Sequence, residues 1–452
     1  MKIASQTVWT ALSILAWLSV GCNSWQLSSD SEIHFQRSDS LRSLEVRAKG
    51  NVAFTEDEKD ILGIFPHGFL LIKERRGLDV RKFQAVQKPD GTLRRSFSFQ
   101  GKSRELDAEA RSWLARILPE VIRQTGMAAD ARVGRLLKQG GPQAVFEEIS
   151  RIESDGVKCL YFRELFDGGN LDSQALQRAA RQISEEISSD GEKATLLSDV
   201  TDLYLKDEAS RPAFFRSLES INSDGERAHL LSSLLNQKEL NPDAFIQILK
   251  SAARISSDGE KARVLVEAAA LGPNHDAVLS EYLTTTATIS SDGEKAGVLS
   301  ALLKKKGLSE DMLVKLLKTT SDISSDGEKA GVLEAAAKVE GARSDAVLSA
   351  YIVTARTISS DGERSRILNA LLERGDLSKD VLKEVLQAAA EISSDGEKAH
   401  VLEQAAPLCA KDEVLLSAFV AATETLSSDG EYRRVMSALM SQKKPVAILR
   451  AH

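Results

Sequence analysis

The chain has few aromatic residues, prolines and cysteines for its length. Phe, Trp and Tyr together make up 5% of its 452 residues, and there are nine prolines and three cysteines. So few aromatic side chains argue against a β-sandwich, whereas abundant Ala, Leu, Glu and Lys favour helices. A chain of this length holds two or three ordinary domains or one extended repeat array, so internal repeats have to be sought first.

The sequence also lacks the common catalytic and metal-binding motifs. It contains no Gly-x-Ser-x-Gly, no Walker loop and no His-Glu-x-x-His, and its six histidines include no pair with metal-ligand spacing on one helix. Cys159 and Cys409 lie in helical, apolar contexts far apart in the chain, which is typical of buried thiols rather than of a disulfide. We therefore predict no catalytic residues, no cofactor-binding residues and no metal ligands.

Residues 1–22 have the pattern of an export signal. Lys2 provides a basic start, residues 8–20 form a short apolar stretch, and small residues precede Cys22. This ending resembles the bacterial lipoprotein signal, in which the cysteine is lipidated and becomes the mature N-terminus, although Ser19 stands where that signal prefers Leu. The resemblance implies an exported lipoprotein with Cys22 as its membrane anchor, on the periplasmic or the surface side of a bacterial envelope. An ordinary cleaved signal is the alternative.

A Ser-Asp-Gly string recurs nine times at spacings of 34 or 35 residues, with its first aspartate at 155 and its last at 429. So regular a period predicts one structural unit stacked on itself over residues 142–452. In one unit, apolar residues follow a helical period over residues 313–320 and again over residues 330–337. The fold class is therefore mainly α, a right-handed superhelical α-solenoid of about nine helical hairpins.

The string "SSDGEKA" has the features of a helix start. Its second serine and the glutamate three residues later match a capping box, in which Ser325 accepts from the backbone of Glu328 and Glu328 reaches back to the Ser325 amide. Gly327 suggests that a neighbouring group comes close, and the aspartates should form a solvated, salt-bridged edge rather than a calcium site. The predicted caps are Ser154, Ser189, Ser223, Ser257, Ser291, Ser325, Ser360, Ser394 and Ser428.

The repeats resemble those of known α-solenoids. The period equals the tetratricopeptide length, but the tetratricopeptide aromatic pattern is missing, so the units are HEAT-like or of a type of their own. More specifically, "ISSDGEKA…VL" at this spacing is similar to helical repeats of poorly characterised bacterial envelope proteins, some of which are joined to antibiotic-sensor-type membrane metallopeptidases. This resemblance implies no activity, and no zinc-peptidase motif is present here.

The region before the repeats has a different character. Residues 41–104 are predicted to form a small β domain of about five strands with a turn at residues 89–91, and residues 41–105 carry 14 Lys and Arg against nine Asp and Glu. Residues 23–40 are predicted to be a linker and residues 105–141 a helical adaptor, with Asp107 as a cap and Pro119 as a break. The basic β domain is suited to contact with anionic lipid head groups or other envelope polymers, and the alternative is that its charges serve solubility alone.

These features favour a non-catalytic scaffold for protein–protein interaction, tethered at the bacterial envelope, with protein partners in the solenoid groove. The alternative is a sensory or regulatory module whose β domain binds a ligand, and an enzyme without a visible motif comes third. Nucleic-acid binding is not expected, because the exported repeat region is acidic and phosphate contacts need clustered Lys and Arg.

Overall fold

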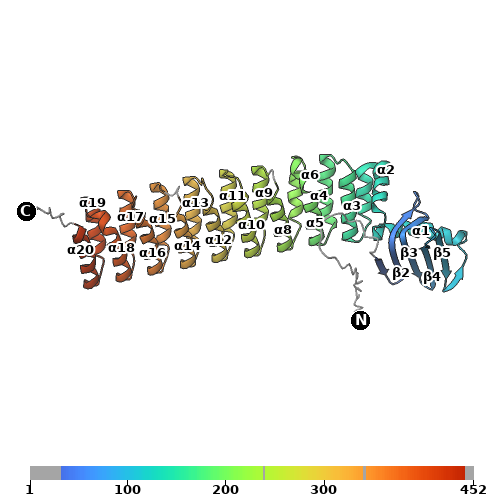
Figure 1. Ribbon diagram of the computed structural model, residues 1–452, viewed down its shortest axis with the longest axis horizontal. Coiled ribbons are helices and arrows are strands. Elements are labelled where there is room, and N and C mark those ends of the chain that lie inside the picture. Colours follow the sequence, from blue (N-terminus) through green and yellow to red (C-terminus); the bar gives the residue numbers. More distant parts are fainter. Residues whose placement is uncertain (1–31, 238–239, 340–342, 443–452) are drawn as a thin grey trace, which may run out of the picture. The chain divides into compact units, whose positions relative to one another are not determined.

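The computed structural model describes residues 32–237, 240–339 and 343–442, which are mainly helical (Figure 1). A small antiparallel sheet comes first and a long run of consecutive helices follows it, as predicted for a solenoid behind a β domain. The described residues form two compact units. The first holds the chain up to Val200 together with Asp207–Ser217, and the second holds Thr201–Lys206 and the chain from Leu218 onward.

The first unit begins with a six-stranded antiparallel sheet in which every strand pairs with the next one along the chain. A turn stabilised by the Asp90 carboxylate, which accepts from the Thr92 amide, connects the fourth and fifth strands as predicted. The strands are β1 (Glu32–Ser38), β2 (Arg42–Phe54), β3 (Ile61–Arg76), β4 (Asp79–Gln87), β5 (Leu93–Phe99) and β6 (Lys102–Arg104).

Strand β1 lies in the stretch that we predicted to be a linker, so that prediction is wrong for residues 32–38. The segment pairs along its whole length with β2, and Ile33 and Phe35 pack against the core of the sheet. An alternating pair of apolar residues among polar ones is enough to define an edge strand once a neighbouring strand supplies the hydrogen bonds. The remaining linker residues, 23–31, and the predicted signal lie outside the described residues.

One face of the sheet packs on helix α1 (Ala108–Thr125). Residues at every second position of β2, such as Leu44 and Val46, are buried against the apolar face of α1, which includes Trp113 and Ile117. The indole nitrogen of Trp113 donates to the buried carboxylate of Glu74 on β3 at 2.7 Å. This bond ties the helix to the middle of the sheet.

Local features of the first unit include a close approach of two strands at a glycine, a proline within α1 and the N-cap of α1. Gly68 lies where β2 passes so closely that an added Cβ would come within 1.9 Å of the Lys49 carbonyl oxygen. Pro119, which we predicted to break a helix, lies inside α1, so this prediction is wrong. Asp107 caps α1 as predicted, by accepting from the Ala110 amide at 2.9 Å.

Five further helices belong mainly to the first unit. The second of the unit's helices bends at Gly141, where φ is 64°, immediately before Pro142 and therefore at the predicted start of the repeats. The helices are α2 (Ala129–Ile149), α3 (Asp155–Gly168), α4 (Ser173–Glu186), α5 (Asp190–Asp199) and α7 (Arg211–Leu218).

The second unit stacks its helices in two layers, visible along its length in Figure 1. From α8 onward, each even-numbered helix contacts the next even-numbered one, and the odd-numbered helices from α9 do the same. We call these the even layer and the odd layer. The helices are α6 (Thr201–Lys206), α8 (Asp224–Leu235), α9 (Pro242–Ala253), α10 (Asp258–Leu271), α11 (Asp276–Ala287), α12 (Asp292–Leu303), α13 (Glu310–Ser321), α14 (Asp326–Ala337), α15 (Asp345–Arg356), α16 (Asp361–Leu372), α17 (Lys379–Ala390), α18 (Asp395–Cys409), α19 (Glu413–Thr423) and α20 (Asp429–Gln442).

Candidate protein-interaction surface

The second serine of the string is the N-cap of the helix that follows it. Ser325 Oγ accepts a hydrogen bond from the Glu328 amide at 3.4 Å, a long bond of modest strength. Ser154 makes no such bond before α3. The same contact with the amide three residues later is made by Ser189, Ser223, Ser257, Ser291, Ser360, Ser394 and Ser428.

The aspartate after the cap joins its own repeat to the next one. Asp292 Oδ2 accepts from the Ser325 amide at 2.7 Å, and Asp292 Oδ1 accepts from the Ser324 amide at 3.1 Å. Both serines directly precede the next even-numbered helix, α14. We call this series of contacts the aspartate ladder. Two successive serine amides are likewise bound by Asp155, Asp224, Asp258, Asp326, Asp361 and Asp395, of which Asp155, Asp258 and Asp395 accept both with Oδ2.

The aspartate ladder corrects two expectations from the sequence. The Ser325 amide, which a capping box assigns to Glu328, donates instead to Asp292 of the preceding repeat. The aspartates do not form a merely solvated, salt-bridged edge either, because each carboxylate of the ladder binds two backbone amides. Sequence patterns within one repeat cannot show a partner that lies more than 30 residues away. The presence of the aspartate in all nine copies was the one signal in the sequence that it has such a partner.

The basic residue of the string makes a second contact between repeats. Lys329 is 4% exposed, and its ammonium group donates to the carbonyl oxygen and the hydroxyl of Thr357 at 3.2 and 2.9 Å. Thr357 is the C-cap of α15, so the cation lies at the negative end of that helix. Similar donation to the chain at the end of a later helix is made by Lys158, Arg227, Lys261, Arg364 and Lys398.

These contacts change the acidity of the groups that make them. The two serine amides hold the pKa of Asp292 below its ordinary value, because hydrogen bonds to the carboxylate favour its charged form. Burial lowers the pKa of Lys329, and nearby aspartates, Asp326 first among them, oppose that effect. Asp292 is therefore a stabilised anion, and Lys329 a partly desolvated cation, at the joints that they form.

The glycine of the string has no close neighbour. An added Cβ at Gly327 would meet no atom within 4 Å, and the same holds at Gly225 and Gly362. Our expectation of a close contact at Gly327 is therefore wrong. The structure gives no packing reason for a glycine there.

The outer surface of the even layer varies from repeat to repeat, although the ladder residues do not. The fifth position after the aspartate is exposed in every repeat of the second unit. It is occupied in turn by His229, Arg263, Gly297, Gly331, Arg366, His400 and Arg434. A solenoid thus presents a row of equivalent positions with different side chains, which is how such folds recognise an extended partner.

A shallow depression of about 450 Å³ lies on this surface between α8 and α10. His229, Ser232 and Asn236 line it from α8, and Glu267 and Leu271 line it from α10. Its lining from α8 is polar, and its lining from α10 includes both polar and apolar side chains. Its open form suits a side chain of a protein partner better than an enclosed small ligand.

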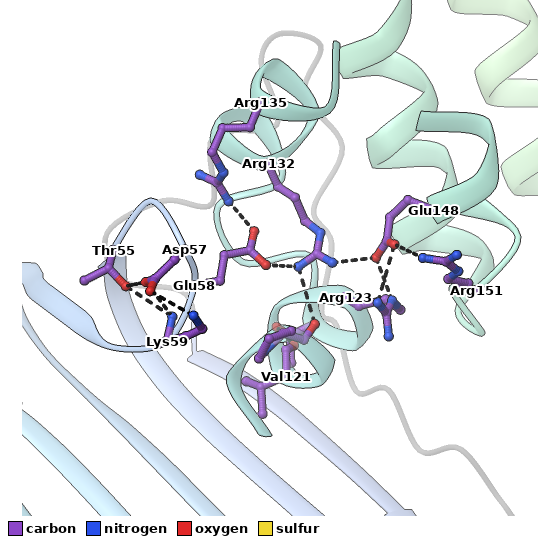
Figure 2. Close-up of polar contacts among 12 residues, drawn as sticks. Thr55, Asp57, Glu58, Lys59, Val121, Arg123, Arg132, Arg135, Glu148 and Arg151 are labelled. Atoms are coloured by element: carbon purple, nitrogen blue, oxygen red, sulfur yellow. Dashed lines mark hydrogen bonds and ion pairs between the residues drawn. The ribbon is translucent and has the colours of Figure 1, made fainter. Parts of the chain in front are cut away.

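A cluster of charged residues in the first unit, shown in Figure 2, fastens the sheet to the first helices, and sequence reasoning missed it. Glu58, in the loop between β2 and β3, pairs with Arg132 and Arg135 of α2. Arg132 also donates to Glu148 at 2.7 Å, and Arg123 of α1 donates to Glu148 at 2.6 Å. Glu148 and Arg132 are nearly buried, with 4% and 8% of their side chains exposed, so each depends on the other for compensation of its charge.

Within the described ranges, no group of three or more His, Cys, Asp and Glu side chains is arranged to hold a metal ion. No helix in these ranges is long and apolar enough to cross a membrane. Cys159 and Cys409 are both buried and unpaired. Burial raises the pKa of their thiols to about 12 and about 11, so both stay protonated near neutral pH and are poor nucleophiles.

Comparison with known proteins gives no family. No family model matches the chain, and no curated protein matches it. Among solved structures, a chain of the Chs5-Bch1 exomer cargo adaptor complex is 9% identical, with a TM-score of 0.18, over 82% of this chain and 84% of that one. A computationally designed, self-assembling cyclic homo-oligomer is 14% identical, with a TM-score of 0.12, over 70% of this chain and 93% of that one.

The aspartate ladder predicts a ranking of substitutions. Ser325→Ala removes one long capping bond and should cost up to about 1 kcal/mol of unfolding free energy. Asp326→Ala should cost more, because it leaves the Ser359 and Ser360 amides without their acceptor. Urea unfolding followed by circular dichroism gives both values, and Asp311→Ala, an exposed aspartate in the first turn of α13, is the control. A larger loss for Ser325→Ala would refute the ladder as the main joint.

The pKa of Asp292 predicts an acid limit to stability. Since this pKa is lowered in the folded chain, Asp292 contributes stability above the unfolded aspartate value of about 3.9, and the contribution is lost as the pH falls through the lower folded value. The carboxyl chemical shift of Asp292 in an NMR titration should therefore change at lower pH in the folded chain than in the urea-unfolded chain. Titration at the same pH in both states would contradict the bonds to Ser324 and Ser325.

Proposed function

We propose that the protein is a non-catalytic scaffold that binds other proteins along its repeats while tethered at a bacterial envelope. The observation that carries the proposal is the contrast between constant joints and variable exposed positions. The aspartate ladder and the basic residues fix the spacing of the helices, and the exposed positions of the even layer are left to vary. A rigid row of variable side chains is suited to recognising a long partner.

The sequence supports the envelope location. The apolar stretch at residues 8–20 and the small residues before Cys22 fit an export signal that ends at a lipidated cysteine. A lipid at Cys22 would hold the sheet and the repeats near a membrane without a spanning helix. Since one acyl chain gives only weak binding, a stable anchor needs several chains or a second contact with the membrane.

The binding surface can be tested with substitutions that the fold tolerates. Gly297 and Gly331 lie in the middle of α12 and α14, are exposed, and have no atom within 4 Å of an added Cβ. Gly297→Arg with Gly331→Arg should therefore leave the fold intact, and arginine favours helix more than glycine does. We expect these changes to reduce the capture of partner proteins from envelope extract at least tenfold, as measured by quantitative mass spectrometry.

The matched control is Thr284→Arg with Val353→Arg, which places the same charges on exposed positions of the odd layer. This variant should capture the same proteins as the unaltered chain. Equal loss in both variants would point to a general effect of charge. Retention of every captured protein in both variants would contradict binding along the even layer.

The anchor is tested separately. In bacterial cells expressing the full chain, we expect a fatty-acid label to be incorporated and the protein to sediment with membranes. Cys22→Ser should abolish the label, while Cys159→Ser should leave it unchanged because that thiol is buried. An unlabelled wild-type chain would show that Cys22 is not lipidated.

A further inference from the structure

The face of the sheet that points away from α1 carries a group of cations. On β3, Glu74 is buried toward α1, so its neighbours Lys73 and Arg75 point to the opposite face, where both are exposed. By the same alternation Lys82, before buried Phe83 on β4, and Arg94 on β5 point outward and are exposed. We call Lys73, Arg75, Lys82 and Arg94 the outer cations.

The outer cations have no anionic partner, whereas most other arginines of the domain do. Arg42 and Arg76 pair with Glu74, and Arg95 lies 3.5 Å from Asp60. In contrast, the side chains of the outer cations form no ion pair or hydrogen bond with any other residue within 32–237, 240–339 and 343–442. Ion pairs within the described residues thus involve most of the other arginines of the sheet and none of these four cations.

The arrangement of the outer cations brings like charges together. Lys73 and Lys82 are directly opposite each other on neighbouring strands. Like charges in such a position repel, because their Cβ atoms are only about 5 Å apart. Arg75 is two residues from Lys73 on the same face, so three cations crowd one end of it. On its other side Lys73 lies opposite Glu45 of β2, but Glu45 pairs with Arg47 and not with Lys73.

We infer that this outer face of the sheet docks on an anionic lipid surface, which makes it the second membrane contact beside the lipid at Cys22. The inference rests on the proposed envelope anchor. Only ten positions separate Cys22 from Glu32, the first residue of β1, so an extended chain there spans at most about 35 Å and keeps the sheet close to the bilayer. A broad sheet face with its cations on one side matches a flat anionic surface.

The charge distribution of the chain supports a membrane as the partner. Residues 41–105 carry 14 Lys and Arg against nine Asp and Glu, whereas the whole chain has a net charge of −7. The rest of the chain is thus acidic and is repelled by anionic lipid. Contact through the outer cations would therefore bring the sheet to the bilayer and keep the repeats available to proteins.

Vesicle binding tests this inference. The chain from Asn23 onward, which keeps every described residue and has no attached lipid, is mixed with vesicles of equal parts phosphatidylglycerol and phosphatidylcholine, and the bound fraction is measured by sedimentation. We expect binding that weakens as salt is raised and is absent with phosphatidylcholine alone. Because each basic residue near an anionic bilayer strengthens binding about fivefold, Lys73→Glu with Lys82→Glu should weaken it at least 25-fold.

The control is Lys304→Glu with Lys306→Glu, which changes the net charge equally but at exposed positions next to α12. This pair should retain binding, and circular dichroism should show that both double variants are folded. Equal weakening by both pairs, or no binding by the unaltered chain, would overturn the inference. So would equally tight binding to a sulfated polysaccharide, which would indicate a general polyanion surface. Vesicle binding by a chain that is not labelled at Cys22 would uphold this inference and refute the lipid anchor.

Discussion

The stacking of the repeats depends on one interaction, the aspartate carboxylate that accepts two backbone amides from the start of the next repeat. Amides before and within the first turn of a helix lack partners in that helix. A carboxylate that accepts from two successive amides constrains both the position and the direction of the segment it binds. The bond between Asp292 and the Ser325 amide therefore adds to the packing of α12 on α14 in setting how these helices stack.

The other constant residues of the string act on the same joint from different sides. The serine hydroxyl caps the helix whose amide the carboxylate holds, and the buried Lys or Arg binds the end of an odd-numbered helix in the following repeat. The cation thus connects the two layers, while the aspartate connects neighbours within the even layer. Each contact reaches only the adjacent repeat, so stability should be a sum of nearest-neighbour terms.

The sequence was sufficient for the features that lie within one repeat. Helical periodicity predicted the paired helices, and the spacing of serine and glutamate predicted the caps that Ser189 and its equivalents form. The roles of Asp292 and Lys329 could not be predicted in this way, because their partners come from the following repeat and a local capping motif explains the same letters. The same holds for the sheet. The alternation of apolar and polar residues indicated the strands within 41–104, whereas β1 could not be predicted because its structure depends on pairing with β2.

The Glu58 cluster shows why long-range polar contacts escape sequence reasoning. Glu58, Arg132 and Glu148 come from a loop and from the two ends of a bent helix, with no spacing that distinguishes them from surface charges. Only the structure shows that these charges are buried and paired.

The contacts at the joints between repeats, in the Glu58 cluster and on the α1 side of the sheet account for the charged side chains that have partners. The charged side chains without a partner can then be identified. On the outer face of the sheet, Lys73, Arg75 and Lys82 lie together without a partner, and no contact within the described residues accounts for this group. A surface that bears a cost in the isolated chain is therefore best explained by what the chain meets outside itself.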